Sequence, residues 1–142
     1  MTMKSLLIAY AGTFSSLLIA DAIWLGLIAR TFYRDQLGAL MLETPNFAIA
    51  ALFYVFFAAA VVLLAVQPGV RANSLLTAMF YGAIMGLAAY GTYDITNLAT
   101  LKGWPVIVSV VDMTWGTFVT ALASTCGLLA LRTFGSPPYI TP

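Results

Sequence analysis

Hydrophobic residues along this chain fall into four long stretches, and the charged residues lie mostly between them. Each stretch reaches the roughly 20 residues that cross the hydrocarbon core of a bilayer. A helix is expected there, because every backbone N–H and C=O group in lipid must find its partner inside the protein. The connections are short, so consecutive helices run antiparallel. The pattern predicts an all-α integral membrane protein, a four-transmembrane-helix antiparallel bundle, with helices at about residues 6–29, 46–66, 75–98 and 105–131.

The whole chain, residues 1–142, is predicted to form a single membrane domain. Pro45 and Pro105 precede the second and fourth stretches, and proline is well tolerated at the start of a helix. Residues 67–69 (Gln-Pro-Gly) follow the second stretch and predict its end. Residues 132–142 are polar and rich in proline, and we expect them to form a flexible tail.

Composition supports a membrane protein and excludes several functions. The chain is 62% hydrophobic and 8% charged, with a mean hydropathy of +0.98, whereas a soluble domain is about 25% charged. A net charge of +1 provides no basic face for nucleic acid. The sequence has no histidine, which removes the usual haem ligands, the histidine-containing zinc sites and the Ser–His and Cys–His nucleophile pairs. No cofactor is predicted, and the one class left open is a hard divalent cation.

The basic residues do not decide the orientation of the bundle. We call side A the membrane face that holds both termini and the second connection, and side B the face that holds the first and third connections. Side A has Lys4, Arg71 and Arg132, and side B has Arg30, Arg34 and Lys102. Because the preference for positive charge on the cytoplasmic side is balanced, only the free amino terminus favours cytoplasmic termini.

The first connection, residues 30–45 (RTFYRDQLGALMLETP), mixes charged side chains with aromatic residues and leucine–methionine pairs. Such a mixture is typical of a short amphipathic segment that lies in the membrane interface. An ordinary polar turn with anchoring aromatic residues fits the same pattern. The sequence leaves both interpretations open.

Three aspartates lie inside the predicted spans, where a carboxylate is costly and therefore informative. At a rise of about 1.5 Å per residue, Asp21 lies about 12 Å inside side B and Asp112 about 10 Å inside the same side. Asp94 lies about one turn from the side-B end of its helix. All three belong to one half of the membrane, which indicates either a functional polar site or carboxylates that pin helices together.

Aromatic and amide side chains accompany these acids at helical spacing. Asp21 and Trp24 are three residues apart, as are Asp112 and Trp115, so each pair shares one helix face. The remaining acid lies on one stripe with a tyrosine four residues before it and an asparagine three residues after it. If these stripes converge, side B contains an acidic and aromatic polar cup. The candidate ligand-binding residues are Asp21, Trp24, Tyr90, Tyr93, Asp94, Asn97, Asp112 and Trp115.

The oxygen atoms in this cup determine which metal ion it could hold. Carboxylate and amide oxygens favour Mg²⁺ or Ca²⁺ over zinc. If the cup binds a metal ion, the candidate ligands are Asp21, Asp94, Asn97 and Asp112. The sequence assigns no residue a catalytic role.

Three blocks of the sequence resemble a known family. They are DAIWLGLIARTFYRDQLGALM (residues 21–41), AAYGTYDITNLATLKGW (residues 88–104) and VVDMTWGT (residues 110–117). In this order they resemble a bacterial family of predicted four-helix membrane proteins, domain of unknown function 2177, over about Ser5 to Leu131. The resemblance implies a fold, a site and a multi-pass location in the bacterial inner membrane, but no reaction. The positions that it singles out are Asp21, Trp24, Tyr93, Asp94, Asn97, Trp104, Asp112, Trp115 and Gly116.

Three functions remain open. The first is a binding or transport protein whose cup holds a cation, a protonated amine or an amphipathic small molecule through charge and cation–π contacts. The second is a membrane-embedded enzyme that uses an aspartate as general acid or base on a lipid-soluble substrate. The third is an accessory subunit of a larger membrane complex. Since four helices are few for a transporter, we expect a homo-oligomer or such a complex, in contact with the lipid bilayer and with no nucleic acid.

Overall fold

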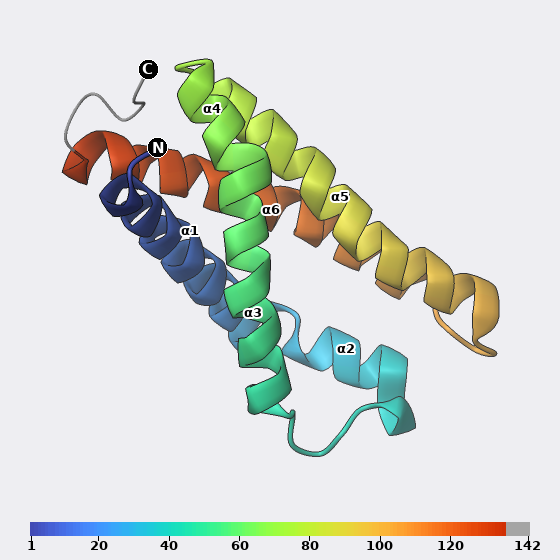
Figure 1. Cartoon of the computed structure of the whole chain (residues 1–142). Coiled ribbons are helices and arrows are strands. Elements are labelled where there is room, and N and C mark those ends of the chain that lie inside the picture. Colours follow the sequence, from blue (N-terminus) through green and yellow to red (C-terminus); the bar gives the residue numbers. More distant parts are fainter. Residues whose placement is uncertain (136–142) are drawn as a thin grey trace.

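The computed structural model describes residues 1–135, and every regular element in that range is helical (Figure 1). Four helical segments are long and apolar enough to cross a membrane, namely residues 3–28, 47–71, 75–100 and 106–134. The predicted four-helix membrane fold is therefore confirmed. The elements in chain order are α1 (Met3–Ile23), η1 (Trp24–Ile28), α2 (Arg30–Leu37), η2 (Gly38–Leu40), α3 (Phe47–Val61), η3 (Val62–Val66), α4 (Gln67–Arg71), α5 (Leu75–Thr100) and α6 (Val106–Phe134).

The first two spans extend beyond their predicted boundaries, each for a local reason. α1 begins at Met3, because the Thr2 side chain accepts the backbone N–H of Ser5 and caps the helix. The second span continues through Pro68 to Arg71 instead of ending before the proline. The carbonyl four residues before this proline lies in η3, whose widened π-type turn accommodates the missing hydrogen bond.

The last span also runs further than predicted. α6 continues to Phe134, so the first residues of the expected tail, 132–134, are helical. Leu131 is buried against α1 and η3, and its carbonyl accepts the N–H of Gly135, which keeps the last turn in place. Residues 136–142, the rest of the expected flexible tail, lie outside the described residues.

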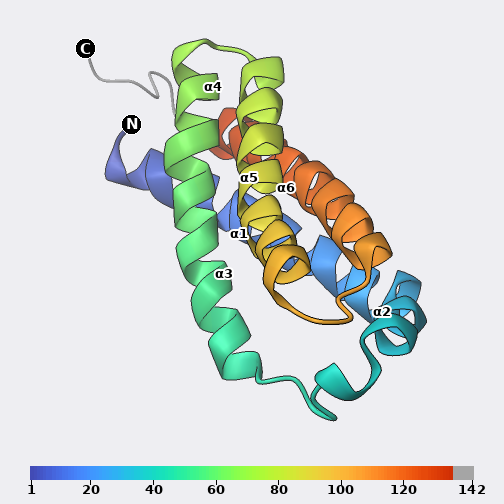
Figure 2. The ribbon, with the colours of Figure 1, turned by 90° about the vertical axis from the view of Figure 1, so that its right-hand side faces the viewer.

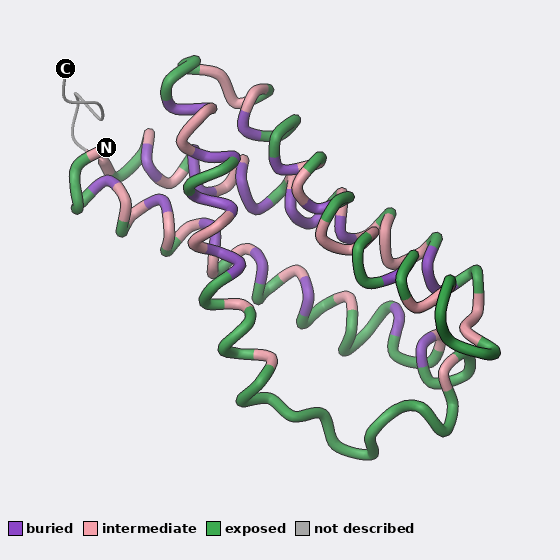
Figure 3. Tube along the Cα trace, turned by 45° about the vertical axis from the view of Figure 1, so that its right-hand side comes forward, coloured by how far each residue is buried: buried purple, intermediate pink, exposed green. Residues whose placement is uncertain are grey.

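α6 is the central helix of the bundle and packs most extensively against α5 and α1. The buried residues of α1 recur at every fourth position and end at Asp21, and those of α5 form a similar row that ends at Asp94 (Figure 3). Both rows are rich in small residues, which allow helices in lipid to approach closely. At Gly86 a Cβ atom would lie 2.1 Å from the carbonyl oxygen of Gly116, so this contact requires glycine. The rows therefore turn both acids toward α6.

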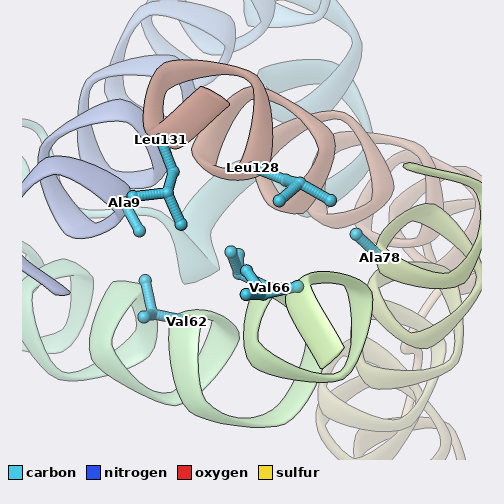
Figure 4. Close-up of a cluster of buried hydrophobic side chains, with 7 residues drawn as sticks. Ala9, Val62, Val66, Ala78, Leu128 and Leu131 are labelled. Atoms are coloured by element: carbon cyan, nitrogen blue, oxygen red, sulfur yellow. The ribbon is translucent and has the colours of Figure 1, made fainter. Parts of the chain in front are cut away.

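The two halves of the bundle are packed differently. The start of α1, the α4–α5 turn and the end of α6 lie together at side A (Figure 1). There the helices meet around an apolar cluster of Ala9, Val62, Val66, Val70, Ala78, Leu128 and Leu131 (Figure 4). Toward side B, α3 stays beside α1 but separates from α5 (Figures 1 and 2). The helices are therefore tightly packed at side A, whereas at side B α3 stands apart from α5.

The first connection contains a short helix, α2, followed by the 3₁₀ turn η2, rather than a simple polar turn. Tyr33 of α2 is buried and packs with Ala29 and Val108, whereas Arg30 and Arg34 are exposed. The chain from η2 to the start of α3 is exposed (Figure 3). α2 is thus attached to the side-B ends of α1 and α6 through its tyrosine.

Candidate functional site

The two Asp-x-x-Trp pairs meet where α1 continues into η1 beside α6. Trp24 and Trp115 stack with ring centroids 4.4 Å apart and an angle of 6° between their planes. Because the first and fourth spans run antiparallel, each tryptophan lies beside the acid of the other helix. Trp115 Nε1 donates a hydrogen bond of 2.7 Å to Asp21 Oδ1. Trp24 Nε1 donates one of 3.2 Å to the hydroxyl of Tyr33, which is itself bonded to Asp112.

Two tyrosines from other elements complete these pairs. Tyr54 of α3 donates a hydrogen bond of 2.6 Å to Asp21 Oδ2, and Tyr33 of α2 donates one to Asp112 Oδ1. The two acids thus connect α1, α2, α3 and α6. Neither tyrosine is among the residues that the sequence predicts for the site. Tyr33 lies in a block that carries the family resemblance, which is a usable signal, whereas Tyr54 stands in a phenylalanine-rich apolar run with no distinguishing spacing.

The two acids differ in what they can still bind. Asp21 is 5% exposed, and both of its carboxyl oxygens already accept a hydrogen bond. Asp112 is half-buried, and its Oδ2 is neither enclosed nor hydrogen-bonded to any described residue. The hydroxyl of half-buried Tyr90 is likewise not enclosed and forms no hydrogen bond with any described residue. Asp112 therefore offers an unused acceptor, and Tyr90 an unused donor.

A cavity of about 870 Å³ lies in the side-B half and is bounded by residues of α1, η1, α2, α3, α5 and α6. The acids, tyrosines and indoles described above form its polar wall. On the side of α2 and the following connection it is lined by Arg30, Arg34 and Glu43. Within the described part of the chain neither arginine makes an ion pair. The cavity thus combines acidic, aromatic and basic side chains.

Asp94 belongs to a different environment. It is 0% exposed in the contact between α5 and α6 and does not line the cavity. Neither of its carboxyl oxygens has a hydrogen-bond partner among residues 1–135. Ser109 donates instead to the backbone carbonyl of Asp94 at 3.3 Å, and Trp104 Nε1 donates to Ser109 at 3.0 Å. Tyr93 is exposed and meets Trp104 edge-on, with ring centroids 5.8 Å apart.

The structure therefore divides the eight candidate residues into two groups. Those that line the cavity are Asp21, Trp24, Tyr90, Asp112 and Trp115. Those that lie outside it are Tyr93, Asp94 and Asn97. Of the two further positions that the resemblance singled out, Gly116 contacts the ring of Tyr90, where a Cβ would come within 2.1 Å, and Trp104 lies beside Tyr93.

The four side chains suggested as ligands of a metal ion are divided in the same way. Asp21 and Asp112 line the cavity, whereas Asp94 and Asn97 do not. Among the described residues, no three or more His, Cys, Asp or Glu side chains are grouped so that they could hold a metal ion. The fold does not assemble the suggested set of four ligands, because Asp94 faces α6 at a different position around the bundle.

Tyr33 lies in the cavity wall but outside the membrane-spanning segments. Burial raises the pKa of its hydroxyl well above the ordinary value of 10.0, and the hydrogen bond to Asp112 raises this pKa further. The hydrogen bond from Trp24 has a smaller, opposite effect. The hydroxyl therefore stays protonated near neutral pH and continues to donate to Asp112.

Comparisons with known proteins agree with a membrane fold. The family described as "Predicted membrane protein (DUF2177)" matches residues 6–129. No curated protein and no solved structure matches the chain. The matched range includes every residue that lines the cavity, but the family description states no ligand and no reaction.

Proposed function

Since the chain belongs to the DUF2177 family of predicted membrane proteins, whose description names no reaction, we propose its function from the geometry of the side-B half. The protein binds an amphipathic small molecule, with the polar head in the cavity and the apolar tail in the surrounding lipid. One observation carries this proposal: a cavity of about 870 Å³ is lined by Asp112 and Tyr90, whose acceptor and donor are unused.

The size and lining of the cavity suit such a molecule. Ligand pockets are typically about 300–1,000 Å³ and combine apolar surface with a few placed polar groups. The stacked indoles of Trp24 and Trp115 supply flat apolar surface, and Leu25 extends it. Indole faces also attract a cationic head such as a protonated amine.

The divergence of α3 from α5 supports entry of the ligand from the bilayer. The two helices separate toward side B, and each contributes a tyrosine, Tyr54 or Tyr90, to the cavity (Figures 1 and 2). A molecule whose tail stays in lipid can therefore insert its head between them without crossing a polar loop.

The packing of side A supports retention of the ligand rather than passage through the bundle. Apolar residues from α1, η3, α4, α5 and α6 fill that half around Val66 and Leu128 (Figure 4). A polar head would have to displace this cluster to reach the opposite face, and closely packed interiors yield to such displacement only at a cost. We therefore propose a binding protein rather than a channel.

The proposed working form is a homo-oligomer or a subunit of a larger membrane complex, because one chain with four spans is small for a membrane receptor or transporter. Light scattering of the detergent-solubilised protein gives its mass. A strictly monomeric protein that co-purifies with no other chain would contradict this part of the proposal.

Photoaffinity labelling tests the binding proposal. Full-length protein is reconstituted in phosphatidylcholine vesicles that contain a long-chain amine with a photoreactive group near its head. We expect labelled peptides from the parts of α1, α3 and α6 that line the cavity. Leu25→Trp fills a lining position and should lower the labelling about tenfold, which corresponds to about 1.4 kcal/mol of binding free energy.

Leu27→Trp is the matched control, because Leu27 lies in the same turn, is exposed and does not line the cavity. It should label like the wild type. Equal labelling of the two variants, or labels spread over all lipid-facing surfaces, would contradict a ligand in the cavity.

One observation also favours a second candidate, the membrane-embedded enzyme. Asp112 Oδ2 is accessible and has no hydrogen-bond partner within residues 1–135, while Tyr33 holds the other oxygen of the same carboxyl group in place. A carboxyl group held in this way can accept a proton from a bound substrate. Incubation of the purified protein with a lipid extract, followed by mass spectrometry, would support this candidate if a product forms that Asp112→Asn does not produce.

A further inference from the structure

We propose that the ligand of the cavity is a phospholipid with a free hydroxyl on its glycerol, of the monoacyl glycerophosphate class. This inference rests on the proposed function and adds the chemistry of the head. Arg30 and Arg34 bind the phosphate, and Asp112 accepts a hydrogen bond from the hydroxyl. The single acyl chain leaves the cavity between α3 and α5.

The phosphate site is the face of α2 that lines the cavity. Arg30, Tyr33, Arg34 and Leu37 all contribute to the lining, and their spacing of three, one and three residues defines one helix face. Neither guanidinium group has an ion pair within residues 1–135. A guanidinium group presents forked donors that match two phosphate oxygens, so two of them on adjacent turns form a strong receptor for one phosphate.

The level of α2 in the membrane matches that of lipid phosphates. α2 begins two residues after the first span ends at Ile28, so its arginines lie at the boundary between hydrocarbon and headgroups. Long arginine side chains reach this boundary while their stems stay on apolar surface. Lys102 also lies on side B but does not line the cavity, so its charge is separate from this site.

The second attachment point lies deeper than the arginines. Asp112 is seven residues past Pro105, about 10 Å into the fourth span. Tyr33 connects the two levels, because it shares the helix face of the arginines and donates a hydrogen bond to Asp112. When Asp112 is ionised its unused Oδ2 can only accept, and the matching group of the lipid below the phosphate is then a donor.

A glycerol hydroxyl satisfies both the position and the chemistry. It lies between the phosphate and the acyl chain, as the depths of the arginines and Asp112 require. The hydroxyl of Tyr90 also lines the cavity and can donate to the ester carbonyl of the acyl chain. All three polar parts of the head then have a partner.

Other amphiphiles leave part of the site unmatched. A diacyl glycerophosphate carries an ester where the hydroxyl would be, and Asp112 Oδ2 then has no donor. A long-chain amine or a monoacylglycerol pairs with Asp112 but provides no anion for the arginines. Glu43, the acidic residue that lines the cavity on the side of the arginines, forms no ion pair with either of them among the described residues and leaves both available.

Native mass spectrometry of the full-length protein in neutral detergent tests the assignment. Four probes are added in turn, three oleoyl esters and one amine with the corresponding oleyl chain: monooleoyl glycerol phosphate, dioleoyl glycerol phosphate, monooleoylglycerol and oleylamine. We expect monooleoyl glycerol phosphate to bind about tenfold more tightly than each of the others, because each of these lacks a partner either for the two arginines or for Asp112.

Variants assign each part of the head to its residues. The double variant Arg30→Gln, Arg34→Gln should weaken both phosphate probes about tenfold and leave monooleoylglycerol unchanged. Asp112→Asn should remove most of the preference for the monoacyl over the diacyl phosphate. Lys102→Gln, which removes a side-B cation outside the cavity, is the matched control and should bind all four probes like the wild type.

The outcomes separate this inference from the proposed function on which it rests. Equal binding of the monoacyl and diacyl phosphates, or no loss in the arginine double variant, overturns the phospholipid assignment. The cavity as an amphiphile site still stands if Leu25→Trp weakens oleylamine. If Leu25→Trp weakens none of the four probes, both proposals fail.

Discussion

At the scale of single residues, the hydrogen bonds of the buried acids give each acid a different role. Each carboxyl oxygen of Asp21 accepts a hydrogen bond, so this residue has a fastening role: it links α1 to α3 and α6. In Asp112 one carboxyl oxygen accepts a hydrogen bond from Tyr33, and the other accepts none from the described residues. Asp94 is buried with no donor to its carboxyl group among the described residues. Each aspartate is therefore assessed separately as part of a polar site or as a structural contact between helices.

Tyr54→Phe tests the fastening role of Asp21. The substitution removes one of the two donors to a carboxyl group that is 5% exposed, so we expect the free energy of unfolding to fall by about 1–2 kcal/mol. Denaturant unfolding in detergent, followed by circular dichroism, measures the change. Tyr81→Phe is the control, because Tyr81 is exposed and has a ring contact but no hydrogen bond to any described residue. Equal effects of the two substitutions would argue against the fastening role.

The raised pKa of Tyr33 predicts how stability depends on pH. Because the folded state holds this proton more tightly than the unfolded chain, the contribution of Tyr33 to stability is complete below about pH 10 and is lost as the pH rises above that value. At about pH 11 native wild type and Tyr33→Phe should therefore have equal phenolate absorbance. Denaturation should reveal one additional phenolate in the wild type. A difference in the native proteins near pH 10 would show that Tyr33 titrates normally.

At the scale of elements, rows of small residues bring α1 and α5 close to α6. Gly82 and Gly86 of α5 face the backbone of α6 at Thr120 and Gly116. This close contact is what aligns the row on α5 and leaves Asp94 enclosed between the two helices. α2 is attached to the bundle differently, because one hydrogen-bonded tyrosine holds it in place rather than a row of close contacts.

Gly86→Ala should destabilise the contact between α5 and α6. The new methyl group would lie 2.1 Å from a backbone oxygen, which cannot move aside like a flexible side chain, so we expect a loss of about 1–3 kcal/mol in the free energy of unfolding. In the control Gly91→Ala the nearest atom, Met113 Cε, lies 3.5 Å away. That variant should match or slightly exceed the wild type, since alanine favours helix over glycine. Thermal melting in detergent compares the two, and equal melting temperatures would refute the close contact.

At the scale of the whole molecule, the bundle is closed at side A and open at side B. α6 passes through both halves, packing against α1 and α5. The second span packs against α5 mainly through η3 and α4 at side A, and its α3 part stays beside α1 toward side B. Both proposals depend on this asymmetry, since both propose that a ligand enters where α3 and α5 separate (Figure 2).

Cysteine labelling tests the arrangement of the four spans. In a Cys126→Ser background, single cysteines replace Thr2, Gln36 or Thr133, which are all exposed. A membrane-impermeant maleimide added to one face of sealed vesicles should label the first and third positions together and Gln36 only from the other face. Labelling of Thr2→Cys and Thr133→Cys from opposite faces would require an odd number of spans and would contradict the fold.

The amino-acid sequence by itself determined the number of spans and their helical form. Four apolar stretches reach the thickness of a bilayer, and lipid leaves their backbone no alternative to a helix. It also determined how deep each acid lies, because the helical rise converts residue number into depth. The helix ends near Thr2, Arg71 and Phe134 depend on capping, a widened turn and tertiary packing, which hydrophobic length does not specify.

Only the tertiary structure decided which side chains meet at that depth. Depth is a coordinate along one helix, whereas a contact also requires the rotation of that helix about its axis and the distance to its neighbours. Close packing against α6 turned Asp94 away from the cavity that Asp21 and Asp112 share. Tyr54 reached Asp21 from an apolar run that had no signal of its own, because the path of α3 beside α1 brought it there. The grouping of polar side chains around the cavity is therefore a property of how the spans pack, which no single span encodes.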